Sequence, residues 1–425
     1  MKFTTFVKSA SVIAFASLLA ACGNGSAGSS DKVELEYFSQ KPEMQATLQE
    51  IITDFEKANP DISIKFSSVP DAETILKTRM ANNEDPDIIN VYPVAADFDA
   101  WAKDGRFLEL GEDAGVGNLK EGAAEFYAID NLKEGAAEFY AIDNKIYSLP
   151  LNTNVYGIYY NKAKFKELGL EVPKTTAEFE KLVATIKDKG ETPFALSLAD
   201  SWSLNGFHQL AWVSAAGGYD QAQDILVRSG KGSITADNPA TQAVVKSFEL
   251  LHDNGQSGFS GAKYADAVAA FADGKALMMP QGSWAAAVIN QQNADLDYGI
   301  FAFPGEKEGD DVTIGGADLA LSISAKTEHP EEAKKFLAYM SSKEVMQKYY
   351  DVDGSPTSVE GVETEGKFPE IEGVAQYAFT DKQIAWLHKE WTSQNDFWTI
   401  AVETIKDPKA DKLANELNAF FDPMK

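Results

Sequence analysis

Hydrophobic and polar positions along the chain follow two alternating periods. Val33–Ser39 alternates apolar and polar residues as a half-buried strand does, and Met44–Ala58 then carries apolar residues at helical spacing. The helical pattern stops at Asn59-Pro60. The same succession recurs, which predicts strands at Ile62–Ser67 and Pro86–Val91 and helices at Ala72–Asn82 and Ala95–Asp104. Strands and helices in alternation predict an α/β lobe with a mostly parallel sheet.

A second α/β lobe is predicted further along the chain. Ile146–Tyr160 has a strand-like pattern, and Thr175–Lys187 is typical of a helix that begins with a capping box from Thr175 to Glu178. Later strands and a helical region are predicted at Ala276–Pro280, Tyr298–Phe303, Leu319–Ser324 and Glu331–Leu417. Roughly 395 residues follow residue 31, more than one hydrophobic core usually supports. We therefore expect an N-terminal lobe of 32–150 plus 278–325 and a C-terminal lobe of 151–277 plus 326–425.

The first residues have the pattern of a bacterial lipoprotein signal. Lys2 and Lys8 charge the start, Ser9–Ala21 is apolar and ends in small residues, and Cys22 follows at once. This is the only cysteine, so no disulfide can form within the chain. We expect 1–22 to be a signal peptide with a lipidated Cys22, and the Gly/Ser-rich residues 23–31 to be a flexible tether at the extracellular face of the membrane. The alternatives are a transmembrane helix, which needs about 20 apolar residues, and an ordinary secretory signal.

Charge and motifs exclude several classes of function. The formal net charge is -27, which opposes binding to nucleic acid, and no basic cluster offsets it. The four histidines and the single cysteine show no metal-binding spacing, so neither a metal nor a cofactor is predicted. No nucleophile elbow or phosphate-binding loop occurs.

A segment of 13 residues, NLKEGAAEFYAID, occurs twice in tandem at 118–130 and 131–143. A 13-residue insertion into a helix rotates the later part of that helix by roughly 220°, so both copies cannot present the same face to the core. We expect one copy to be extruded at the surface, as loop insertions often are. Deleting residues 131–143 should then leave ligand affinity near normal in isothermal titration. A large gain or loss would show that the duplication acts on the hinge.

Four blocks in order resemble one family, the extracellular solute-binding proteins of sugar ABC transporters. They read PDIINVYP (86–93), NKIYSLPLNTNVYGIYYNKAKFKELGL followed by VPKTTAEF (144–179), GKALMMPQGSW (274–284), and GGADLALSIS with HPEEAKKFLAYM (315–340). GFHQLAW (206–212) and DGSPTS (353–358) are similar to the raffinose- and multiple-sugar-binding lipoproteins of Gram-positive bacteria. The duplication departs from the family pattern just before the block that resembles the first crossing between lobes.

The resemblance implies a two-lobed periplasmic-binding-protein type II fold, similar to that of maltose-binding protein, with a hinge between the lobes. It implies an oligosaccharide receptor that is not an enzyme, with two membrane permease subunits and a separate cytoplasmic ATPase as partners. A raffinose-type α-galactoside is the expected ligand, and fructo-, gluco- and malto-oligosaccharides remain open. The other alternative is a surface glycoside hydrolase, which would need two carboxylates about 5 to 10 Å apart.

A sugar site needs aromatic faces beside hydrogen-bonding side chains. Asp318 interrupts an apolar strand and needs a partner, which could be a sugar hydroxyl pair or a structural N–H or lysine. Asn152 and Asn154 flank the presumed crossing, where we expect them to satisfy hinge backbone. The residues expected to contact ligand are Lys41, Asn90, Tyr92, Trp202, Trp284, Asp318, Asp396 and Phe397. Lys41, Asn90 and Tyr92 are chosen because they follow strands at the edge where open α/β sheets bind ligands.

Overall fold

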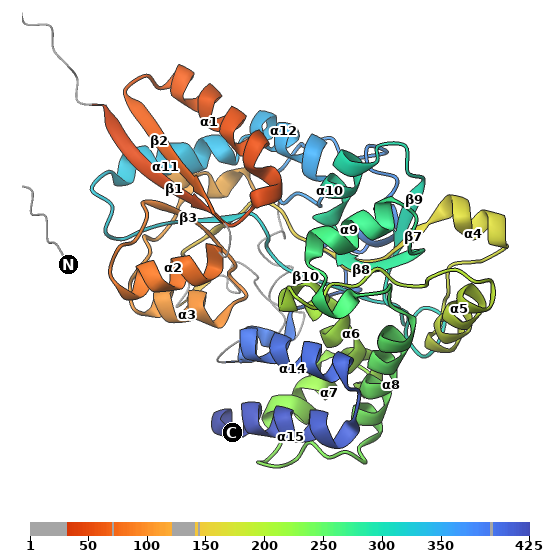
Figure 1. The fold of residues 1–425 in the computed structure, drawn as a ribbon. Helices are drawn as coiled ribbons and strands as arrows, with labels where there is room; N and C mark the ends of the chain where they lie inside the picture. The colour runs from red at the N-terminus through yellow and green to blue at the C-terminus, as the bar shows by residue number, and fades with distance from the viewer. Residues whose placement is uncertain (1–31, 70–71, 121–140, 143–144, 392–393) are drawn as a thin grey trace, which may run out of the picture.

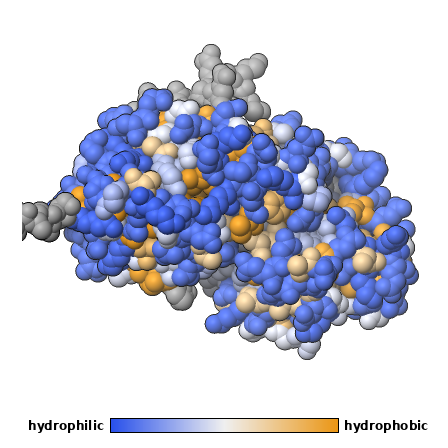
Figure 2. Space-filling view, turned by 90° about the horizontal axis from the view of Figure 1, so that it is seen from above, coloured by the Kyte–Doolittle hydropathy of each residue, from blue (hydrophilic) through white to orange (hydrophobic). Residues whose placement is uncertain are grey.

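The computed structural model describes residues 32–69, 72–120, 141–142, 145–391 and 394–425. Cys22 and the tether lie outside this range, as does most of the duplicated segment, of which only 118–120 and 141–142 are described. In the described part of the chain, no helix is long and apolar enough to cross a membrane. Hydrophilic side chains cover most of the face seen in Figure 2.

The first lobe is built on a five-stranded sheet in the order β2-β1-β3-β11-β6. The strands are β1 (Val33–Ser39), β2 (Ile62–Ser68), β3 (Ile88–Val91), β6 (Leu149–Pro150) and β11 (Ala320–Ile323). β1 pairs in parallel with β2 and β3, whereas β11 is antiparallel to β3 and β6. The predicted parallel sheet is therefore correct for the first three strands, which the chain visits in βαβ succession.

Helices cover both faces of this sheet (Figure 1). Leu35 and Tyr37 point to the side of α1 (Gln45–Ala58), α11 (Pro330–Met340) and α12 (Lys343–Asp353), with which they share a core. Phe38 and Ile89 point to the opposite side and pack with α2 (Ala72–Ala81) and α3 (Ala96–Lys103). The alternation seen in the sequence thus distributes apolar residues to two cores, one on each face.

The second lobe contains a three-stranded antiparallel sheet in the order β8-β7-β9. Its strands are β7 (Tyr156–Asn161), β8 (Met278–Gly282) and β9 (Tyr298–Phe301), and a parallel pair of β10 (Thr313–Gly315) and β12 (Gln383–Ala385) lies beside it. The helices of this lobe are α4 (Lys162–Leu168), α5 (Thr176–Asp188), α6 (Asn205–Ala216), α7 (Tyr219–Gln223), α8 (Pro239–Asn254), α9 (Tyr264–Ala272), α10 (Ala285–Gln292), α13 (Glu372–Ala375), α14 (Asn395–Lys406) and α15 (Ala410–Phe421).

Short elements complete the described chain. They are the hairpin of β4 (Ala141–Ile142) and β5 (Lys145–Ile146), the π-helix Asp224–Arg228, and the 3-10 turns Pro42–Met44, Glu112–Ala114, Val116–Asn118, Ser201–Leu204, Phe259–Gly261, Leu387–Glu390 and Asp422–Met424. The predicted Thr175 cap of α5 is confirmed, since Thr175 Oγ1 accepts from Glu178 N at 3.2 Å. The second half of the capping box does not form, because Glu178 Oε2 accepts from Lys174 N at 2.8 Å and not from Thr175 N.

The strand pairings differ from the predicted division of the chain at two places. β8 and β9 pair with β7, so 278–301 lies in the second lobe and not in the first. The helices α11 and α12, assigned by prediction to the C-terminal lobe, pack on the first sheet through Phe336 and Met346. The apolar face of a segment shows that it is buried but does not show which sheet buries it, and that choice is made by tertiary contacts.

Three segments lie side by side where the lobes meet, and the first two of them connect the lobes. They are 151–155 between β6 and β7, 316–319 between β10 and β11, and 354–358 after α12. Leu151 N donates to Leu319 O at 2.8 Å, and Thr153 N donates to Pro356 O at 2.8 Å. The strand-like pattern predicted over Ile146–Tyr160 is thus divided by the first connection, in which Asn152, Thr153 and Asn154 are polar although they are buried.

Candidate functional site

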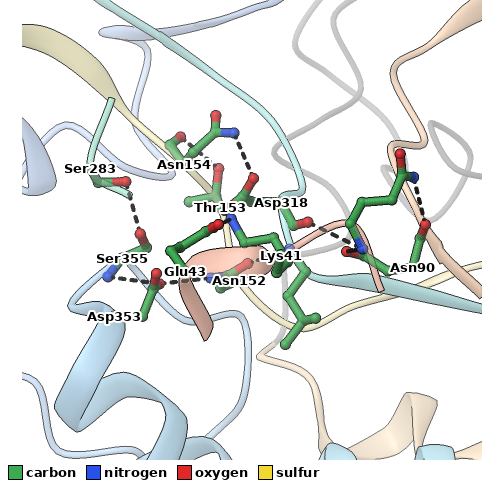
Figure 3. A network of polar contacts seen from close by, with 12 residues as sticks. Lys41, Glu43, Asn90, Asn152, Thr153, Asn154, Ser283, Asp318, Asp353 and Ser355 are labelled. Atoms are coloured by element: carbon green, nitrogen blue, oxygen red, sulfur yellow. Dashed lines mark hydrogen bonds and ion pairs between the residues drawn. The ribbon is translucent and has the colours of Figure 1, made fainter. Parts of the chain in front are cut away.

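Lys41 lies at the carboxyl end of β1, where the chain turns into Pro42–Met44. Only 2% of the residue is exposed. Its Nζ forms ion pairs with Asp318 and, at 2.6 Å, with Glu43 (Figure 3). Burial by itself lowers the Lys41 pKa, but Asp318 and then Glu43 outweigh it, so this pKa is raised well above its ordinary value. Lys41 therefore stays charged inside the protein.

Asp318 joins this cation to the connections between the lobes. One carboxylate oxygen faces Lys41 Nζ, and the other accepts from Asn154 Nδ2 at 3.2 Å. Only 3% of Asp318 is exposed. Of the partners considered for Asp318, a sugar hydroxyl pair or a structural N–H or lysine, the chain itself supplies the lysine.

Asn90 holds the segment that carries Asp318. It is fully buried at the end of β3, and its Nδ2 donates to Asp318 O at 3.3 Å and to Ala320 O at 3.2 Å. Its Oδ1 accepts from Gln40 N at 3.3 Å. Tyr92, half-buried beside it, donates to Gln40 O at 3.4 Å. Both residues thus lie beside Lys41 as expected, with Asn90 engaged by backbone.

Asn152 and Asn154 hold the backbone of the crossing segments. Asn152 Oδ1 accepts from Leu319 N at 2.7 Å, and Asn154 Oδ1 accepts from Gly316 N at 3.0 Å. Asn152 Nδ2 donates to Asp353 Oδ2 at 3.1 Å. These contacts agree with the predicted role of both asparagines at the hinge.

Three aromatic residues of the second lobe form one group, which we call the aromatic trio: Trp202, Tyr264 and Trp284. The ring centroid of Trp202 lies 5.1 Å from that of Tyr264 and 6.3 Å from that of Trp284. Trp202 is 38% exposed. Burial raises the Tyr264 pKa, and the nearby Glu43 carboxylate raises it further while Lys41 opposes it. Tyr264, and with it the trio, therefore lies near the charged cluster of the first lobe.

Four buried polar atoms near the boundary between the lobes have no hydrogen-bond partner among the described residues. They are Tyr264 OH and Trp284 Nε1 in the second lobe, and Tyr349 OH and Asp353 Oδ1 in the first. The Tyr349 pKa is raised by burial and then by Asp353, with smaller effects of Lys41, Asp318 and Glu43. An unpaired buried polar atom costs about 1–3 kcal/mol. A polar ligand between the lobes would remove that cost for Tyr264, Trp284 and Tyr349.

Asp396 and Phe397 are not brought to this cluster. Phe397 is fully buried in the core of the second lobe, stacked on His208 at 4.1 Å between ring centroids and 8° between planes. Asp396 is exposed on the first turn of α14. Their predicted contact with ligand rested on a polar interruption among aromatic residues. Gln394, in the same interruption, does reach the other lobe, since its Nε2 donates to Glu73 Oε1 at 3.1 Å.

Sequence reasoning missed several members of the site: Glu43, Tyr264, Tyr349, Asp353 and the pair Ser283 and Ser355. Tyr264 and Tyr349 follow the apolar pattern of their helices, so nothing local separates them from core residues. Asp353 carries a signal, because a carboxylate that ends an amphipathic helix opposes the helix dipole.

Comparisons with known proteins identify relatives over nearly all of the chain. The family model described as bacterial extracellular solute-binding protein matches residues 39–347. A multiple sugar-binding protein of Streptococcus mutans is 48% identical over 96% of this chain and 95% of its own. A melibiose/raffinose/stachyose-binding protein of Bacillus subtilis is 24% identical over 69% of this chain and 66% of its own.

Two solved structures resemble the whole fold. The solute-binding protein RafE in complex with raffinose superposes with a TM-score of 0.87 at 45% identity, covering 92% of this chain and 100% of that one. The apo form of RafE from Streptococcus pneumoniae gives a TM-score of 0.78 at 45% identity, covering 94% of this chain and 99% of that one.

Proposed function

Because this chain belongs to the bacterial extracellular solute-binding protein family, we propose that it captures an oligosaccharide between its lobes and delivers it to an ABC importer. A raffinose-type α-galactoside is the ligand we favour. The RafE complex with raffinose and the B. subtilis protein named for melibiose, raffinose and stachyose support this choice. The matched relatives are binding proteins, and the chain is accordingly a receptor and not a glycoside hydrolase.

One observation in the structure carries the proposal: the aromatic trio lies near a charged cluster of the other lobe through Tyr264, and on both sides buried polar atoms have no partner among the described residues. Sugars present apolar C–H faces that stack on aromatic rings and hydroxyl groups that bond to charged side chains. Trp202 supplies an accessible ring, while Lys41, Glu43 and Asp318 supply charged hydrogen-bonding groups. A sugar in this position would contact both lobes, as closure by a ligand requires.

The chain superposes better on the sugar complex than on the apo form. At equal identity, the TM-score is 0.87 against the raffinose complex and 0.78 against the apo form. The Gln394–Glu73 hydrogen bond joins the two lobes in this arrangement. This difference supports a hinge motion that a sugar would drive toward closure.

We further propose that the protein is held at the extracellular face of the membrane by a lipid on Cys22 and by the tether of residues 23–31. Its partners would be two permease subunits and a separate ATPase. The family is extracellular, and the lipoprotein signal in the sequence supports the anchor. Metabolic labelling with a fatty acid, lost in Cys22→Ala, tests this part.

The direct test is isothermal titration of the body from Lys32 onward with raffinose, melibiose, sucrose, maltotriose and a fructo-oligosaccharide, with product analysis of each mixture. Tight binding of raffinose without cleavage supports the proposal. Binding confined to another sugar keeps the receptor and overturns the α-galactoside. Cleavage products would overturn the receptor itself.

Replacing an aromatic of the trio should weaken sugar binding without unfolding the protein. We expect Trp202→Ala and Trp284→Ala each to lower affinity by about 1–3 kcal/mol, roughly 5- to 150-fold, through lost stacking and burial. Val172→Ala is the matched control, because Val172 is also 38% exposed but lies between α4 and α5. Unchanged affinity in both tryptophan variants would remove the trio from the site.

A further inference from the structure

Asp353 is a buried carboxylate with an incomplete set of partners. It is the last residue of α12, and none of it is exposed. Its Oδ2 accepts from Asn152 Nδ2 at 3.1 Å and from Ser355 N at 3.2 Å, while its Oδ1 has no partner among the described residues. A negative charge at a helix C-terminus is also opposed by the helix dipole. The ionised side chain is therefore costly for the folded protein.

The position of Asp353 links all three segments that lie side by side where the lobes meet. Through Asn152 it reaches the first connection and, by way of Leu319 N, the second. Through Ser355 it reaches the second lobe, since Ser355 Oγ and Ser283 Oγ are hydrogen-bonded at 2.8 Å (Figure 3). Ser283 follows β8 directly, and α10 beyond it packs against α12. Elements of the second lobe thus help to shield Asp353 from water. An opening of the hinge would therefore increase the exposure of its carboxyl group to water.

The charged and titratable groups around Asp353 come from every neighbouring element. Lys41 and Glu43 lie on the turn after β1, Asp318 on the second connection, Tyr349 and Tyr350 on α12 itself, and Tyr159 on β7. α10 carries no titratable side chain. If Glu43, Asp318 and Asp353 are all ionised, the cluster carries three negative charges against the one positive charge of Lys41. One proton would relieve part of that excess.

We propose that Asp353 takes up a proton when the lobes close over sugar, so that ligand affinity rises as the solution is acidified. The inference rests on the proposed function and adds a regulation of the same site. Burial, opposed in part by Lys41 and increased by Asp318, raises the pKa of Asp353 to about 6, against an ordinary value of 3.8. When the hinge opens and water reaches the carboxyl, the pKa falls toward the ordinary value. The closed state then binds the proton more tightly, and by linkage the proton favours closure.

Isothermal titration with raffinose in phosphate and in imidazole, two buffers of different ionisation enthalpy, measures the protons exchanged on binding. We expect wild type to take up a fraction of one proton at pH 6 and almost none at pH 8, and to bind up to roughly tenfold more tightly at pH 5 than at pH 7.5. In Asp353→Asn, which keeps an acceptor oxygen for Asn152 and Ser355, the uptake should vanish. Asp351→Asn is the matched control, since Asp351 lies on the same helix but its side chain is 45% exposed.

A second measurement is urea unfolding with the sugar that the direct test identifies, present at saturation so that the lobes are closed. In that state ionised Asp353 destabilises the fold above pH 6, so Asp353→Asn should have a higher urea midpoint than wild type at pH 8, and the difference should shrink toward pH 4. If raffinose binds but no proton uptake occurs, or if the uptake persists in Asp353→Asn, the inference is overturned while the receptor stands. If raffinose gives no binding heat, the choice of raffinose as ligand is wrong. A difference between the urea midpoints that does not depend on pH would also overturn the inference.

Discussion

Replacing Asp318 with asparagine should lower sugar affinity by at least about 2 kcal/mol, roughly 30-fold, measured by isothermal titration. The carboxylate accepts from Lys41 Nζ and from Asn154 Nδ2 at separate oxygens. Asparagine has one acceptor oxygen, so one of these donors loses its partner whichever way the amide is turned. The result is a misplaced Lys41 or a misplaced hinge segment, and both lie at the proposed site.

Asp85→Asn is the control for this experiment. Asp85 is also a buried carboxylate, paired with Arg106 at 2.6 Å, and its side chain is 0% exposed. It precedes β3, whereas Asn90 and the charged cluster lie at the other end of that strand. We expect Asp85→Asn to lower stability and to leave affinity unchanged. Equal affinity losses in the two variants would mean that general destabilisation, and not the site, explains the effect of Asp318→Asn.

Acidification should strongly destabilise the second lobe because it buries two neutral histidines. Burial lowers the pKa of His208 and of His388 to about 3, from an ordinary value of 6.5. Between these values the unfolded chain binds more protons than the folded one, so stability is present above pH 6.5 and is lost as the pH falls toward 3. Each histidine contributes about 1.4 kcal/mol per pH unit. When the lobes are closed, Asp353 acts in the opposite direction between about pH 6 and pH 4 and offsets the effect of about one histidine there.

Urea unfolding at pH 8, 6, 5 and 4 measures this loss. His208→Gln can still accept from Trp212 Nε1, which donates to His208 Nε2 at 3.2 Å. The variant should lose about 1.4 kcal/mol less per pH unit than wild type below pH 6. The comparison at pH 8, where His208 is neutral in both folded and unfolded chains, measures the packing loss alone. Parallel pH profiles would show that His208 does not drive acid unfolding.

Local pattern predicted much of the secondary structure and several site residues. α1 ends at Ala58 where Asn59-Pro60 predicts its stop, and the Thr175 cap forms as expected. Lys41 was selected because it follows a strand, and Asp318 because it interrupts an apolar one. Both criteria are local, since they depend on strand ends and on the cost of burying a charge.

The misassigned residues show where local pattern is insufficient. Phe397 has the aromatic and polar neighbours expected of a binding residue, yet it packs on His208, almost 190 positions earlier in the chain. Tyr264 looks like a core residue of α9, and only the folded chain shows that it faces Glu43. A side chain's neighbours in sequence describe its own element, whereas its role depends on what other elements place opposite it.

Residue pattern alone was enough to predict the succession of strands and helices, the resemblance to solute-binding proteins, the strongly acidic surface and the need of Asp318 for a partner. The folded chain was required to show that this partner is Lys41, 277 residues away, that β8 and β9 join β7, and that Asp353 lies among the connections between the lobes. The physical reason is that periodicity reports which face of an element is buried, while the choice of what covers that face is made by packing and hydrogen bonding between distant segments.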